Sequence, residues 1–340
     1  MAGRLSGDGR GALRRLRDRP AGRSRPGRRA VKARVRVATA TLFQRPTTDR
    51  PADEAVLGDI VDVRRWVAAM DADERMRAAV LTQVLLGEQV LVTQERDGWA
   101  QVTVTGQPAD DLDPRGYPGW LPAGHLAPED DEADSPGEPE YVVAVTATTL
   151  RDAPEGDVAL PSVVLGTRLR GASIPHRRRA ADDTWRAVHV PGRAEPLFGR
   201  TLDLAPVASA PADLRPRDVL KTATMLRETD YVWGGLTPFG IDCSGLVHVS
   251  WRRHGRLLPR DAYNQAAATT PVPFGDERPG DLYFFARDGA RIHHVGLVAA
   301  APRGDRRVML HACSSARQVV VEEVQGERAA TLVAAHRVLA

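Results

Sequence analysis

The chain has 340 residues, of which 42% are hydrophobic, and this is enough apolar material for two or three domains with their own cores. Two cysteines exclude a disulfide framework as the main source of stability. No apolar stretch has the length of a transmembrane helix or of the apolar part of a secretory signal. We therefore expect no integral membrane segment and a cytoplasmic location; a misread start or export route would instead make the protein extracytoplasmic.

The net charge of +3 is unevenly distributed. Residues 1–37 hold twelve Arg and one Lys against two Asp, a surplus of eleven positive charges, so the rest of the chain carries a net charge of −8. Segment 1–32 is rich in Arg, Gly and Pro and has too few large apolar residues for a core, which predicts a basic disordered tail. Nucleic acid or an anionic membrane could bind such a tail. Because no aromatic residues are interleaved with the charges, we expect no nucleic-acid partner, and a solvated tail or a start codon placed too far upstream is the simpler interpretation.

The segment 33–128 begins with alternating apolar residues, which is typical of strands. A polar stretch at 51–80 predicts a helical insertion, and strands are expected again at 84–92 and 99–104. Its end, G-Y-P-G-W at 116–120, resembles the closing part of a bacterial SH3-like domain. We expect a small all-β barrel that carries a helical insertion.

A second β segment follows at 141–206, after an acidic, proline-containing linker at 129–140. It contains W-R-A-V-H-V at 185–190, which parallels W-A-Q-V-T-V at 99–104 in the first segment. Two weakly similar SH3-like barrels are the economical interpretation.

The remaining segment, 211–340, contains one cysteine in a setting that suits catalysis. Cys243 lies between a glycine-rich approach and a helical pattern that starts at Leu246, with Val247 and Trp251 one turn apart. Gly255 is a plausible end for this helix. A thiol in the first helical turn is near the exposed amides, which help to lower the pKa of the thiol and to stabilise an oxyanion. A nearby imidazolium would lower the pKa of the Cys243 thiol further. The other cysteine, Cys313, is expected to have a structural role.

Histidines on two later strands could supply the base. His294 shares a face of the predicted strand 292–300 with Gly296, which leaves room for a substrate. His311, on the predicted strand 308–312, could orient the first imidazole. Nucleophile, base and orienting group are the three roles of a catalytic triad.

The same region resembles the NlpC-type bacterial cell-wall cysteine peptidases, which are papain-like in fold. Six pieces occur in family order: Y-V-W-G-G at 231–235, G-I-D-C-S-G-L-V at 240–247, L-P-R-D at 258–261, R-P-G-D-L-Y-F-F at 278–285, H-H-V-G-L-V at 293–298 and L-H-A at 310–312.

The resemblance implies an α+β papain-like catalytic domain preceded by two small all-β SH3-like barrels, and it makes Cys243 the nucleophile. His294 becomes the base and His311 the third polar residue, while the Tyr231 hydroxyl helps to hold the tetrahedral intermediate. Asp242 matches a position that holds the substrate's free amino end. Ser244 keeps the turn small, so that a substrate backbone can come close. No metal or organic cofactor is implied.

The upstream modules resemble those of γ-D-glutamyl-L-diamino-acid endopeptidases that act on freed muropeptides. In that group an acidic residue and a tyrosine of the first module receive the free amine of the N-terminal L-alanine, and the matching positions here are Glu88 and Tyr117. We expect hydrolysis of murein stem peptides at this bond. The alternatives are a DL-endopeptidase or amidase acting on intact murein, and an inactive protein that binds cell-wall peptides.

Overall fold

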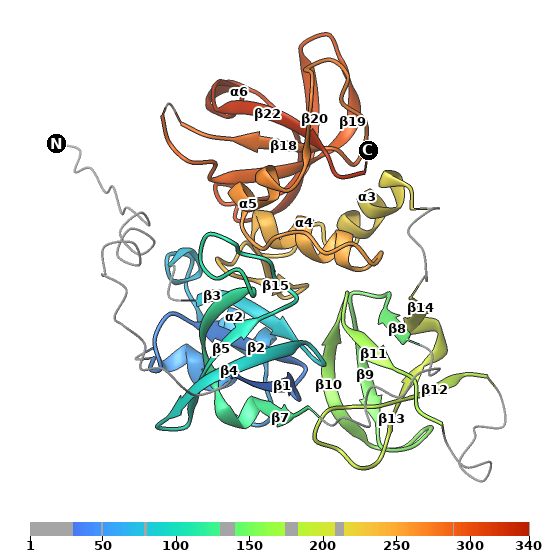
Figure 1. The fold of residues 1–340 in the computed structure, drawn as a ribbon. Helices are drawn as coiled ribbons and strands as arrows, with labels where there is room; N and C mark the ends of the chain where they lie inside the picture. The colour runs from blue at the N-terminus through green and yellow to red at the C-terminus, as the bar shows by residue number, and fades with distance from the viewer. Residues whose placement is uncertain are drawn as a thin grey trace.

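The computed structural model describes residues 30–48, 50–77, 80–129, 140–173, 183–207, 214–287 and 289–339. They form two mainly β N-terminal units and one C-terminal α+β unit, which lies above the other two in Figure 1. Residues 1–29 of the predicted tail 1–32 lie outside the described residues. The first strand begins at Val31. Of the predicted linker 129–140, only Glu129 and Glu140 are described.

The first unit is an antiparallel sheet of seven strands in the order β3-β2-β6-β5-β4-β1-β7. The strands are β1 Val31–Val35, β2 Thr39–Phe43, β3 Val80–Leu85, β4 Gln89–Arg96, β5 Trp99–Val104, β6 Tyr117–Pro122 and β7 Leu126–Pro128. The single strand expected over 84–92 is in fact two strands. Gly87, whose φ of +79° suits glycine, makes the turn between β3 and β4.

The helical insertion predicted at 51–80 is confirmed as three short helices. They are the 3₁₀ helix η1 Pro51–Val56, the α-helix α2 Val63–Ala69 and the 3₁₀ helix η2 Glu74–Met76. Trp66 of α2 is fully buried in the core of the first unit, and its indole donates to Asp53 over 2.8 Å. The insertion therefore closes one side of this core. A further 3₁₀ helix, η3 Ala123–His125, joins β6 to β7.

The second unit contains two antiparallel sheets, β10-β9-β13-β12 and β11-β8-β14. Its elements are β8 Glu140–Val143, β9 Ala147–Arg151, β10 Val158–Val164, β11 Arg168–Arg170, β12 Trp185–Val188, β13 Leu197–Arg200, the 3₁₀ helix η6 Thr201–Asp203 and β14 Leu204–Pro206. Among the described strands, the first unit's sheet ends at β3 and β7 and the second unit splits into two sheets. Both units are built on β-sheets, and a closed SH3-like barrel stays a prediction for each.

The C-terminal unit is α+β, as expected for a papain-like domain. Its antiparallel sheet has the order β17-β22-β18-β19-β20-β21, and α4 packs against β19 and β20. Its helices are α3 Pro216–Thr224, α4 Cys243–Arg252, α5 Ala262–Ala267 and α6 Gly326–Ala330. Its strands are β15 Leu236–Thr237, β16 Gly240–Ile241, β17 Thr270–Val272, β18 Leu282–Phe285, β19 His294–Arg303, β20 Arg306–Cys313, β21 Gln318–Glu323 and β22 Leu332–Arg337.

The helix α4 lies between this sheet and the two N-terminal units (Figure 1). All ten of its residues are buried, as expected for a helix that is packed on every side. In the described ranges, no helix combines the length and the apolar character needed to cross a membrane.

Candidate active site

Cys243 is the first residue of α4 and is 7% exposed. Asp242 caps the helix, because its carboxylate accepts from the backbone N–H of Gly245 over 2.7 Å. Only glycine fits at position 245, because a Cβ there would lie 2.4 Å from the carbonyl oxygen of Gly235. The predicted helix and the position of the thiol in its first turn are both confirmed.

His294 and His311 are brought together by the pairing of β19 with β20. Nε2 of His294 lies 2.7 Å from Nδ1 of His311, and both side chains are buried. His293 is exposed, whereas His294 is buried and contacts His311, so the geometry favours His294 over its neighbour as the base. The expected orienting contact between the two imidazoles is present.

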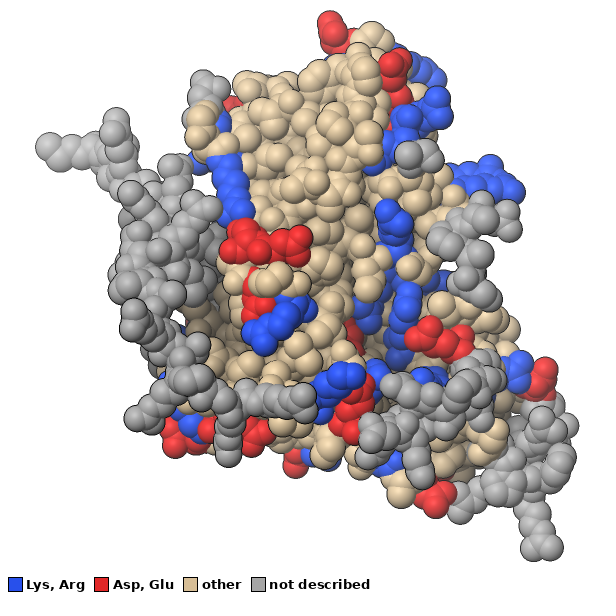
Figure 2. Space-filling view, in the orientation of Figure 1, with Lys and Arg blue, Asp and Glu red and all other residues tan. Residues whose placement is uncertain are grey.

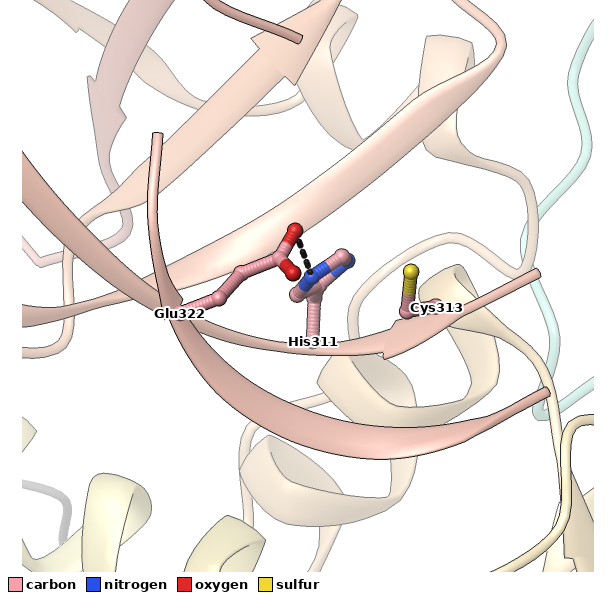
Figure 3. Close-up of side chains that lie close together, drawn as sticks. All are labelled: His311, Cys313 and Glu322. Carbon is pink, nitrogen blue, oxygen red and sulfur yellow. Dashed lines mark hydrogen bonds and ion pairs between the residues drawn. The ribbon is translucent and has the colours of Figure 1, made fainter. Parts of the chain in front are cut away.

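Glu322 of β21 extends this chain of contacts, as Figure 3 shows. Its carboxylate lies 3.0 Å from Nε2 of His311. A carboxylate can only accept, so His311 carries its proton on Nε2 and uses Nδ1 as an acceptor. His294 must then donate from Nε2, which leaves Nδ1 of His294 free to take a proton. The Glu322 carboxylate thus selects the tautomer that a general base needs.

The backbone amide of Val295, the residue that follows His294 on β19, is among the groups that lower the pKa of the Cys243 thiol. Burial and the nearby Asp242 charge outweigh this effect and raise the pKa of the thiol to about 12. Burial also lowers the pKa of His294 well below its usual value, and the neighbouring His311 acts in the same direction. Both pKa shifts favour a neutral thiol and a neutral imidazole, in contrast to the thiolate and imidazolium expected from the helix dipole.

Tyr231 is also at this site. A bridge to Ile241 holds its backbone beside the capping turn, and its side chain is buried. Burial raises the pKa of the Tyr231 hydroxyl well above its usual value, with Cys243 and Asp242 as the next contributions. This shift keeps the hydroxyl in its protonated form, which can donate to an oxyanion.

Asp242 has different contacts from those expected of a residue that receives the substrate's amine. The guanidinium of Arg260, which is 1% exposed, binds both carboxylate oxygens of Asp242 at 2.9 and 2.7 Å. Gly234 and Gly245 donate to the same carboxylate from their backbone amides. A carboxylate has about four lone-pair sites. Asp242 therefore fixes the catalytic turn, and no acceptor site is left for a substrate ammonium.

Ser244 belongs to the same network. Its hydroxyl accepts from Arg260 over 2.9 Å and donates to Asp242 over 3.3 Å. Its carbonyl accepts from Gln265 over 2.9 Å. These contacts hold the turn, and they engage both the hydroxyl and the carbonyl of Ser244. Burial works against the charge of Arg260, but the Asp242 carboxylate holds its pKa above the usual range.

Glu88 is not brought to the nucleophile. Its carboxylate is 3.2 Å from the guanidinium of Arg252, the last residue of α4. Cys243 is the first residue of this ten-residue helix, so the two ends are about 13 Å apart at 1.5 Å per residue. The expected role of Glu88 in receiving the substrate amine is therefore corrected: this carboxylate joins β3–β4 to the far end of α4.

Tyr117 does reach the catalytic unit, where it meets an acidic residue that has no assigned role in the sequence analysis. Its hydroxyl donates to Asp261 over 3.2 Å, and Tyr263 donates to the same oxygen over 3.0 Å. Burial raises the pKa of the Asp261 carboxyl, although Arg260 and Tyr263 counter it in part. The side chain is nevertheless partly exposed. The signal that could have identified Asp261 was its place in L-P-R-D at 258–261.

The first unit also seats directly on the catalytic turn. Thr82 accepts from Nε of Arg260 over 2.8 Å, and Gln83 accepts from the backbone of Leu236 over 2.9 Å. These groups belong to β3, so the end of β3 forms part of the wall around the turn that carries Cys243.

His311, Cys313 and Glu322 bring donor atoms to within 4.8 Å of one another (Figure 3). Such a set resembles a zinc site in its residue types. However, the guanidinium of Arg328 lies 2.9 Å from Glu322 and 3.3 Å from the sulfur of Cys313. A positive charge at this place opposes a metal ion, and the carboxylate is already engaged with His311. The cluster is better explained as support for the triad.

Comparison with known proteins agrees with this geometry. Residues 228–338 match the NlpC/P60 family. The chain is 31% identical over 293 residues to a gamma-D-glutamyl-L-lysine dipeptidyl-peptidase of Bacillus subtilis, covering 84% of this chain and 90% of that protein. A Bacillus cereus protein of the same description is 30% identical, with 82% and 85% covered.

A solved structure of an NlpC/P60 family protein from Bacillus cereus is similar over 91% of this chain and 100% of its own, with a TM-score of 0.78 and 28% identity. The similarity therefore includes the N-terminal β units as well as the catalytic unit. The thiol at the start of α4, the paired histidines and these relatives together show that the chain is a cysteine peptidase and belongs to the NlpC/P60 family.

Proposed function

We propose that the enzyme hydrolyses the γ-D-glutamyl-L-diamino-acid bond of murein-derived peptides whose N-terminal L-alanine has a free amine. The observation that carries this proposal is the contact between Tyr117 and Asp261, which joins the first β unit to the catalytic unit next to Arg260, the residue that pairs with Asp242. The names of the two Bacillus relatives, gamma-D-glutamyl-L-lysine dipeptidyl-peptidases, support the choice of this bond as the one that is cleaved. We also propose that both N-terminal units are SH3-like, and that the first narrows the active site.

The Asp261 carboxylate has the properties of a receptor for an ammonium group. Both tyrosine hydroxyls donate to Oδ2, and among the described residues no hydrogen bond uses Oδ1. A carboxylate desolvated by its neighbours gains more from an ammonium than a solvated one does. A substrate with an acylated amine would leave Oδ1 unpaired, so this site rejects blocked peptides.

The proposed reaction starts with the neutral pair. As the sulfur of Cys243 forms a bond to the γ-glutamyl carbonyl carbon, its proton passes to Nδ1 of His294. The backbone N–H of Cys243 at the start of α4 and the Tyr231 hydroxyl stabilise the oxyanion. The tetrahedral intermediate then expels the amine of the diamino acid, which takes the proton from His294.

A thioester between Cys243 and the glutamyl group remains after this step. Water attacks the thioester carbonyl while His294 accepts a proton from that water, and the thiolate leaves and takes the proton back. His311 and Glu322 keep His294 in the required tautomer through both halves of the reaction. No cofactor is needed for any proton or bond in this sequence.

The proposal is tested with synthetic L-Ala-γ-D-Glu-L-diamino-acid peptides, free or acetylated at the amine, and mass analysis of the products. We expect L-Ala-D-Glu and the free diamino acid from the unblocked peptide. Hydrolysis of the acetylated peptide should be at least about a hundredfold slower. Equal rates on both peptides would contradict the free-amine specificity and favour an enzyme acting on intact murein.

A further inference from the structure

A second cavity lies where the three units meet, at the opposite end of α4 from Cys243. Its volume is about 280 Å³. The turn around Glu88, strand β11, the loop after β12 and the last residue of α4 all contribute to its wall. Pockets for drug-sized ligands usually span roughly 300 to 1,000 Å³, so this cavity suits a small molecule.

The wall of this cavity is strongly basic. Five arginines line it, against two glutamates, Glu88 and Glu140: Arg34, Arg168, Arg170, Arg193 and Arg252. Figure 2 shows basic side chains gathered in a recess on this face, where the C-terminal unit meets the N-terminal units. The planar guanidinium fork matches the oxygens of phosphate and carboxylate groups, and several forks in one small cavity are the usual way to hold a phosphate.

Two buried polar atoms of the wall, Nε of Arg168 and Oε2 of Glu88, lack a hydrogen-bond partner among the described residues. The guanidinium of Arg168 lies 3.7 Å from Glu140. Burial lowers the pKa of Arg168, and the Glu140 charge offsets this only in part. An anion in the cavity would supply the missing partner.

The carboxylate of Glu88 indicates a second property of the ligand, a hydrogen-bond donor. Its side chain is 2% exposed, and Oε1 pairs with Arg252 at 3.2 Å, but Oε2 is buried without a hydrogen-bond partner among the described residues. A buried acceptor of this kind calls for a donor. The ligand should therefore carry both anionic oxygens and at least one hydroxyl.

We propose that this cavity binds a phosphate group that bears a hydroxyl, either inorganic phosphate or a small hydroxylated phosphate monoester. The arginines hold the anionic oxygens, and the hydroxyl donates to Glu88. Because the wall combines residues of all three units, the ligand binds only to their assembled arrangement and stabilises it. The site is separate from the thiol chemistry and does not depend on the proposed peptide specificity.

The test is calorimetric titration of the full chain with inorganic phosphate, with sulfate and with a hexose 6-phosphate near neutral pH. Phosphate or the sugar phosphate should bind at millimolar concentration or below and raise the Tm. Sulfate should bind at least about tenfold more weakly, because it has no proton to donate to Glu88. Tighter binding of the ester or of inorganic phosphate decides between the two sources.

Arg168→Gln should weaken phosphate binding about tenfold. Arg227→Gln, a change to an exposed arginine outside the cavity, should leave it unchanged. If Arg168→Gln does not fold, Arg193→Gln at the more exposed rim provides the same comparison. The absence of binding, equal affinity for sulfate and phosphate, or equal affinity in the cavity variant and the Arg227 control would overturn the proposal.

Discussion

The hydroxyl of Tyr117 and the carboxylate of Asp261 lie 3.2 Å apart, although 144 positions separate them in the chain. One residue belongs to β6 of the first N-terminal unit and the other directly precedes α5 of the catalytic unit. The contact therefore joins a unit that carries none of the proposed catalytic residues to the catalytic unit. In the proposed function, the specificity can be changed without a change to the thiol, the histidines or the oxyanion donors.

Cys243→Ala should abolish hydrolysis and leave the Tm nearly unchanged, because the small side chain fits the first turn of α4. His294→Ala should slow the alkylation of Cys243 by iodoacetamide about a hundredfold near neutral pH, since the buried thiol ionises only when the imidazole takes its proton. Peptide mapping by mass spectrometry separates Cys243 from Cys313. Undiminished alkylation in the His294 variant would show that the thiol is activated by another group.

Glu322→Leu should lower kcat about tenfold to a hundredfold with little change in KM, because His311 loses the acceptor that fixes its tautomer. Glu322→Gln keeps an acceptor oxygen and should recover most of the activity. Glu323→Leu is the matched control, since this neighbouring residue pairs with the exposed Arg306 instead. Equal kinetics for the Leu and Gln variants at position 322 would argue against a positioning role.

His248 predicts a dependence of stability on pH that is independent of catalysis. It is buried on α4, and burial lowers its pKa from 6.5 to about 3, with the charges of Arg252 and Arg260 as further causes. Between these two pH values the unfolded chain binds more protons than the folded protein, so the free energy of unfolding falls as the pH falls. The loss is about 1.4 kcal/mol per pH unit for this one group.

His248→Gln removes the titration and can still donate to the carbonyl of Leu258, which the imidazole contacts at 2.7 Å. Urea unfolding at several pH values should therefore show a weaker loss of stability below pH 6.5 in this variant. The exposed His189→Gln should follow the wild type. Parallel curves for all three proteins would remove His248 as a cause of acid sensitivity.

Local patterns predicted the helix and the strands that carry the candidate catalytic residues. The helical period after Leu246 placed Cys243 in a first turn, and strand alternation placed His294 and His311 so that neighbouring strands could join them. Both predictions depend on residues close together in the chain or on adjacent strands. The directions of the pKa shifts of the thiol and the imidazole were not predictable, because they depend on how completely the surrounding structure buries both groups.

Contacts between residues far apart in the chain were harder to predict. Asp242, Glu88 and Arg260 are all charged, and nothing local indicates that Arg260 pairs with Asp242 or that Glu88 pairs with Arg252 at the wrong end of α4 for catalysis. Only the docking of the first unit decides which carboxylate is left for a ligand. Sequence reasoning thus named Tyr117, which reaches the catalytic unit, but did not name Asp261, the acidic residue that Tyr117 contacts.

The most direct measurement is the ratio of kcat/KM for the free peptide to kcat/KM for the acetylated peptide, compared between wild type, Asp261→Asn and Glu88→Gln. The free amine should be favoured at least about a hundredfold in the wild type, and Asp261→Asn should bring the ratio close to one by slowing only the free peptide. Glu88→Gln should keep the wild-type ratio. A ratio unchanged by Asp261→Asn, or one lost in Glu88→Gln, would contradict the assignment of Asp261 as the receptor of the substrate's amino end.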